Sequence, residues 1–128
     1  MFNLLLVVVG GGIGAGIRHL TNMGALRLVG PNYPWGTMAI NILGSFAMGL
    51  FIAIMARRGG PNEVRLFVAT GILGGFTTFS SFGWEMFEAV EKDTVFNGAA
   101  NVVLSVVLGY AAVWLGAALT GWLARVTR

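Results

Sequence analysis

Four long apolar segments, separated by short connections rich in Pro, Gly and charge, limit how this chain can fold. They run from about 2 to 29, 35 to 56, 64 to 90 and 95 to 126. A helix needs about 20 mostly apolar residues to cross the hydrocarbon core of a bilayer, and each segment is long enough. We therefore expect an all-α membrane protein, with residues 1–128 forming a single four-helix transmembrane domain.

The scarcity of charge supports the membrane class and excludes others. Charged residues make up 10% of the chain, against about a quarter in soluble domains. Because the net charge of +3 comes from scattered residues, no basic patch suggests nucleic acid. The chain has no cysteine, its one histidine is His19, and its first carboxylate is Glu63. No nucleophile–base constellation can be built, so we do not expect an enzyme.

The distribution of basic residues bears on orientation. Four spans would place both termini on one side of the membrane. Five basic residues would accompany them, Arg57, Arg58, Arg65, Arg125 and Arg128. Arg27 and Lys92 would lie on the other side. This bias favours cytoplasmic termini by the positive-inside rule.

Pairs of small residues four apart predict close helix packing. Gly10 with Gly14, and Gly12 with Gly16, form two interleaved pairs in the first span. The third span has such a pair in residues 71 and 75, and the second has one in residues 45 and 49. Such faces let helix backbones approach closely in lipid, within one chain or between subunits.

Two polar side chains inside the first two spans need partners. A charge at mid-membrane costs at least about 2.5–3.5 kcal/mol, so Arg18 is expected to snorkel, to have a structural partner, or to attract anions at a water-filled mouth. Asn41 is the only strongly polar side chain of its span. Its amide would form an interhelical hydrogen bond, or would offer donors to a passing anion.

The stretch TGILGGFTTFSSFGWE, residues 70–85, is a poor continuous helix. Gly74 and Gly75 each cost about 1 kcal/mol relative to alanine, and hydroxyl residues follow them. A helix that breaks at mid-membrane is tolerated only where its backbone is buried in protein or lines a cavity. Phe79 and Phe82, three apart, would share one face if a helix resumes. We expect a break that lines a polar cavity.

These motifs resemble those of the Fluc (CrcB) fluoride channels. The resemblance rests on WGTMAIN (35–41), on GILGGFTTFSSF (71–82) followed by Glu85, and on GGGIGAGIR ending at Arg18. Length, span number and motif order match along essentially the whole chain. The resemblance implies an antiparallel, dual-topology dimer with the third helix broken mid-membrane and two fluoride pores. It also implies passive export of toxic cytoplasmic fluoride across the bacterial inner membrane.

The resemblance also implies site residues. The fluoride pore would use Arg18, Asn41, Thr78, Phe79, Ser80, Ser81, Phe82, Glu85 and Ser105. Gly74 and Thr77 would give backbone carbonyls, from both subunits, to a central structural Na⁺. The chain departs from the family pattern at Ser81 and Gly83, which replace a threonine and a serine, and at Asn101, where a tyrosine is common.

Some alternatives stay open. The charge bias disagrees with dual topology, so the bias is too weak to matter or the chain pairs with an oppositely oriented paralogue; we favour the homodimer. A small proton-coupled exporter would need a membrane-embedded carboxylate, and the first two spans have none. A non-transporting assembly subunit would not need the run of hydroxyls and phenylalanines.

Overall fold

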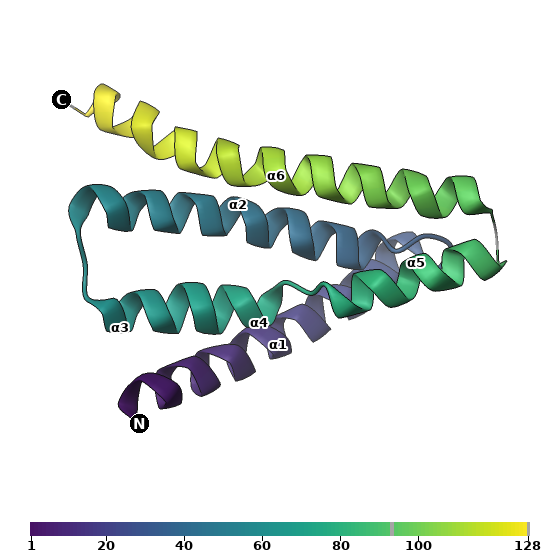
Figure 1. Cartoon of the computed structure of the whole chain (residues 1–128), viewed down its shortest axis with the longest axis horizontal. Coiled ribbons are helices and arrows are strands. Elements are labelled where there is room, and N and C mark those ends of the chain that lie inside the picture. Colours follow the sequence, from purple (N-terminus) through teal and green to yellow (C-terminus); the bar gives the residue numbers. More distant parts are fainter. Residues whose placement is uncertain (93, 128) are drawn as a thin grey trace.

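The computed structural model describes residues 1–92 and 94–127, and these are helical apart from short connections. The elements are α1 (Phe2–Val29), α2 (Trp35–Arg58), α3 (Asn62–Arg65), the π-helical η1 (Leu66–Leu73), α4 (Gly74–Phe76), α5 (Ser80–Lys92) and α6 (Val95–Val126). Elements α3 to α5 follow one another along a single segment (Figure 1). The described chain therefore has four helical segments long and apolar enough to cross a membrane, as expected.

The ends of these segments follow from local chemistry. Gly30 and Gly59, with positive φ of 79° and 72°, end α1 and α2 in a conformation that glycine adopts without strain. Pro34 and Pro61 precede α2 and α3, where their missing N–H costs no helical hydrogen bond. Thr94 Oγ1 accepts a hydrogen bond of 3.2 Å from a backbone N–H in the first turn of α6.

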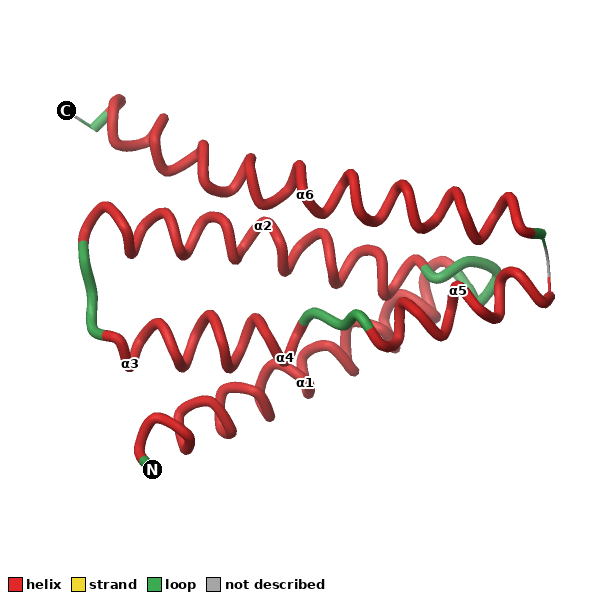
Figure 2. The backbone as a smooth tube through the Cα atoms, viewed as in Figure 1, coloured by secondary structure: helices red, strands yellow, loops and turns green. Residues whose placement is uncertain are grey.

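The helices form an open bundle whose two ends are distinct. Both termini and the α2–α3 connection lie at one end, and the other two connections lie at the opposite end (Figures 1 and 2). α2 packs along α6, whereas α1 crosses the bundle and packs against η1 and α4. Few large side chains are buried, and apolar residues are exposed along every segment. This outward apolar surface suits lipid.

Glycines permit close approach of the backbones at two helix contacts. A Cβ on Gly14 would overlap the carbonyl oxygen of Ile72 in η1, and one on Gly75 would come within 2.5 Å of the carbonyl oxygen of Gly11. A Cβ on Gly116 would likewise overlap the α2 backbone at Phe46. Small residues thus pack α1 against η1 and α4, and α6 against α2, as small-residue faces do in lipid.

Candidate functional site

The centre of the site is a non-helical interval, residues 77–79, between α4 and α5 (Figure 2). Thr77 has extended backbone, with φ of −73° and ψ of 155°. Its N–H still donates to Leu73 over 3.0 Å, so the helical ladder ends there. In a continuous helix the next N–H, that of Thr78, would donate to the Gly74 carbonyl, but here it donates to a side chain of α2. The Gly74 carbonyl thereby loses its usual helical donor.

That side chain is Asn41, whose amide forms hydrogen bonds with both the N–H and the carbonyl of Thr78. Asn41 Nδ2 donates to the Thr78 carbonyl over 2.9 Å, and Thr78 N–H donates to Asn41 Oδ1 over 2.8 Å. A buried backbone group without a partner costs about 1–3 kcal/mol, so the two bonds to Asn41 offset those that Thr78 does not make within a helix. An amide carries two N–H groups, so one N–H of Nδ2 remains for another acceptor.

Arg18 reaches the same interval from α1. Its Nη1 donates to the Thr77 carbonyl over 3.2 Å, and the side chain is half-buried. Of the roles left open by the sequence, the structure therefore gives Arg18 a structural partner. That partner is a neutral carbonyl and not a carboxylate, and the guanidinium has further N–H donors beside the interval.

The aromatic pair and the serines follow directly. The ring centroids of Phe79 and Phe82 are 6.0 Å apart, within the range of aromatic contact. Phe82 is buried, whereas Phe79 is 84% exposed, and Ser80 and Ser81 are exposed too. Thr78 is buried, and its Oγ1 accepts a hydrogen bond of 3.3 Å from the Ser81 N–H. One ring and two hydroxyls thus lie on the outer surface of a single chain.

Glu85 is tied to α2 by a residue that the sequence analysis did not select. Thr37 Oγ1 donates to Glu85 Oε1 over 2.5 Å, and Thr37 is almost fully buried. Glu85 Oε2 is a buried atom without a hydrogen-bond partner among the described residues. Because Thr37 lies four residues before Asn41, both occupy one face of α2. That spacing within WGTMAIN was the signal that could have identified Thr37.

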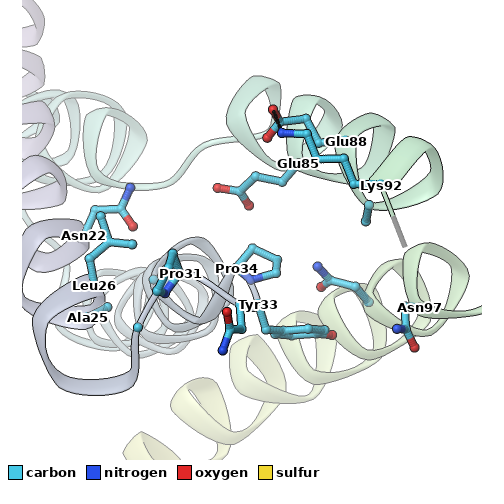
Figure 3. A pocket seen from close by; sticks show the side chains of 15 residues that line it. Asn22, Ala25, Leu26, Pro31, Tyr33, Pro34, Glu85, Glu88, Lys92 and Asn97 are labelled. Atoms are coloured by element: carbon cyan, nitrogen blue, oxygen red, sulfur yellow. Dashed lines mark hydrogen bonds and ion pairs between the residues drawn. The ribbon is translucent and has the colours of Figure 1, made fainter. Parts of the chain in front are cut away.

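Glu85 also lines a cavity of ≈ 390 Å³ at the end of the bundle away from the termini. In Figure 3, side chains of α5 face the connection between α1 and α2 across this space. Asn101 of α6 lines the cavity and is 2% exposed. Its Oδ1 accepts a hydrogen bond of 2.9 Å from Ser105 Oγ. Tyr33 also lines the cavity, and burial raises the pKa of its phenol.

The structure thus divides the expected site residues into groups. Arg18, Asn41 and the interval form one hydrogen-bonded cluster. Glu85 belongs with Thr37 at the cavity. Ser105 bonds within its own helix, one turn from Asn101, and is joined to neither group by a hydrogen bond among the described residues.

Comparisons with known proteins identify the family of the chain. Residues 5–117 match the family model described as CrcB-like protein, Camphor Resistance (CrcB). A protein of Mesorhizobium japonicum is 70% identical over 125 residues, which cover 98% of each chain. One of Agrobacterium fabrum is 47% identical over 120 residues, covering 93% of this chain and 96% of the relative. Both relatives are named fluoride-specific ion channel FluC. The chain therefore belongs to the CrcB family.

Proposed function

We propose that this chain is a fluoride-selective channel, not an enzyme, and that it exports toxic cytoplasmic fluoride by passive electrodiffusion. The observation that carries the proposal is 70% identity, over 98% of both chains, to a protein named fluoride-specific ion channel FluC. The four apolar helices are consistent with a multi-pass protein of the bacterial inner membrane.

The chemistry around residues 77–79 suits a small, strongly hydrated anion. Removing water from fluoride requires replacement donors, and the second N–H of Asn41 and the exposed hydroxyls of Ser80 and Ser81 are available for this. Phe79 and Phe82 can turn their positive ring edges toward an anion without binding it tightly. Weak binding at several sites is what conduction requires.

We also propose positions along the pathway for Arg18, Glu85 and Ser105. Arg18 would supply positive potential beside the interval, because its partner is a neutral carbonyl. Glu85 would lie where the pathway opens into the cavity at the end of the bundle, since it lines that cavity. Ser105, one turn from the cavity-lining Asn101, would donate to the ion on the α6 side.

We further propose that two copies assemble as an antiparallel, dual-topology homodimer with two pores. Phe79, Ser80 and Ser81 are exposed on one chain, and a pore wall of this kind needs a second wall opposite it. The non-helical interval falls at the middle of the 31-residue segment Asn62–Lys92, which is consistent with a break at mid-membrane.

A structural Na⁺ at the dimer centre would use the carbonyls of Gly74 and Thr77 from both copies. Unwound backbone carbonyls suit this ion. The Gly74 carbonyl lacks its usual helical donor, because the Thr78 N–H donates to Asn41 instead. The Thr77 carbonyl accepts from Arg18, but a carbonyl oxygen has two lone pairs and can serve both. The sodium would hold together the region where the two intervals meet.

Liposomes loaded with potassium fluoride test the function. With valinomycin present, purified protein should release fluoride rapidly, whereas chloride release should stay at the rate of protein-free liposomes. The narrow donor-lined path disfavours the larger anion. Equal chloride release would contradict a fluoride-selective channel, and fluoride release that requires a proton gradient would point to a coupled exporter.

Phe79→Ile should slow fluoride release and leave thermal stability in detergent almost unchanged. The ring is 84% exposed within its own chain, so it contributes little to folding, yet isoleucine offers an anion no positive ring edge. Phe96→Ile, at a 78% exposed phenylalanine near the start of α6, is the matched control and should leave both quantities unchanged. Full fluoride release by Phe79→Ile would show that the Phe79 ring is not part of the fluoride pathway.

A further inference from the structure

A small basic cavity lies near the ends of α2 and α6. Figure 1 shows these helix ends on the side of the bundle that carries both termini. The cavity has a volume of ≈ 220 Å³ and is lined by Arg57, Gly121, Ala124 and Arg125. These residues come from the last turns of α2 and α6. We refer to these four residues as the α2–α6 basic pocket.

Gly121 leaves space beside α6 for the guanidinium of Arg57. A Cβ built on this glycine would lie 3.0 Å from Nη2 of Arg57, so the guanidinium reaches across from α2 and lies over bare backbone of α6. A contact at 3.0 Å would require the guanidinium to give way by a few tenths of an ångström, and a longer side chain would fill the space. The pocket therefore lies between the exposed Arg57 side chain and the α6 backbone at Gly121.

No acidic side chain neutralises this pocket within the described chain. The one ion pair among residues 1–92 and 94–127 joins Lys92 to Glu88, at the opposite end of the bundle. Neither Arg57 nor Arg125 has a hydrogen bond or ion pair there. Two like charges that share a small cavity repel each other, and an anion between them would relieve the repulsion.

We infer that the α2–α6 basic pocket binds the phosphate of an anionic phospholipid. Arginine presents a planar fork of donors that matches phosphate oxygens. The pocket lies where two apolar helices end, which is the depth of lipid headgroups. Trp122, next to Gly121, and Ile54, one turn before Arg57, are exposed apolar side chains beside which acyl chains can pack. This apolar border favours a lipid over free phosphate, and the inference does not depend on fluoride transport.

Native mass spectrometry of the delipidated protein with equimolar phosphatidylglycerol and phosphatidylcholine tests the inference. The wild type should retain phosphatidylglycerol at least about five-fold more than phosphatidylcholine, since one basic residue near an anionic surface supplies about that factor. Arg57→Gln and Arg125→Gln should each lose most of this preference. Arg58→Gln is the matched control, because Arg58 carries the same charge next along α2 without lining the pocket.

Gly121→Leu separates a built site from general attraction, because it fills the pocket and keeps every charge. It should lose the preference as Arg57→Gln does, with circular dichroism confirming that both variants are folded. If Gly121→Leu does not fold, the contrast between Arg57→Gln and Arg58→Gln decides. Equal losses in Arg57→Gln and Arg58→Gln, or a preference retained in folded Gly121→Leu, would overturn the inference. Displacement of the lipid by equimolar inorganic phosphate would overturn the assignment to lipid.

Discussion

Gly14→Ala is expected to destabilise the folded chain by about 3 kcal/mol, the upper range for forcing extra volume into a packed interior. The added Cβ would overlap the carbonyl oxygen of Ile72 and would lie 2.8 Å from the backbone nitrogen of Phe76. Backbone atoms cannot rotate away as side chains can, so α1 would have to move off η1 and α4. Chemical denaturation in mixed micelles, followed by tryptophan fluorescence, measures this loss.

The same substitution at Gly12 is the matched control. Gly12 lies two residues away on α1, and a Cβ there would meet nothing within 4 Å. Gly12→Ala should therefore be neutral or should stabilise the helix by up to about 1 kcal/mol. Equal losses in the two variants, independent of protein concentration, would contradict the packing described for α1. If Gly12→Ala lowers stability, and lowers it further when the protein is diluted, a second copy of the chain packs on that face.

Gly12 and Gly14 show how much of the packing of α1 could be predicted from the sequence. Two interleaved glycine pairs in the first span predicted close packing, and residues two apart lie on nearly opposite faces of a helix. The sequence does not say which face meets a neighbour, because that depends on the rotation of α1 about its axis. The structure turns Gly10 and Gly14 toward η1, whereas Gly12 and Gly16 have open space beside them.

The position of the non-helical interval, residues 77–79, also could be predicted only in part from the sequence. Gly74 and Gly75 were expected to weaken the third span, yet both are helical, and the helix ends after Phe76. Gly75 is needed for another reason, since its lack of a Cβ lets α4 approach the backbone of α1. The interval follows the glycines because Asn41 supplies the hydrogen bonds that Thr78 would otherwise make within the helix.

Hydrophobicity predicted the four apolar helices, since a run of about 20 apolar residues needs no knowledge of its neighbours. Long-range partners were harder to predict. The sequence left Arg18 and Asn41 with alternatives, and it indicated no role for Thr37, because their partners lie in other segments of the chain. Each of these hydrogen bonds depends on the relative depth and rotation of two helices, which composition does not specify.

Asn41→Leu is expected to reduce fluoride release to that of protein-free liposomes and also to lower stability. Leucine has a similar branched shape but forms neither hydrogen bond to Thr78, whose N–H and C=O would lose these partners. Each buried group left unpaired costs about 1–3 kcal/mol. The interval would then rearrange, and the donors proposed to carry fluoride would lose their positions. Flux from liposomes and denaturation in micelles, measured on the same preparation, give the two quantities.

Asn101→Leu is the matched control, because it removes a buried amide of the same size. Among the described residues, Asn101 Oδ1 accepts only from Ser105 Oγ, four residues along the same helix, and that hydroxyl can turn to a backbone carbonyl instead. Its loss of stability should therefore be much smaller than that of Asn41→Leu. Normal fluoride flux in Asn41→Leu would show that the Asn41 side chain is not part of the fluoride pathway. Lost flux with unchanged stability would mean that Asn41 acts on the ion and does not support the interval, because no rearrangement of residues 77–79 could then explain the loss.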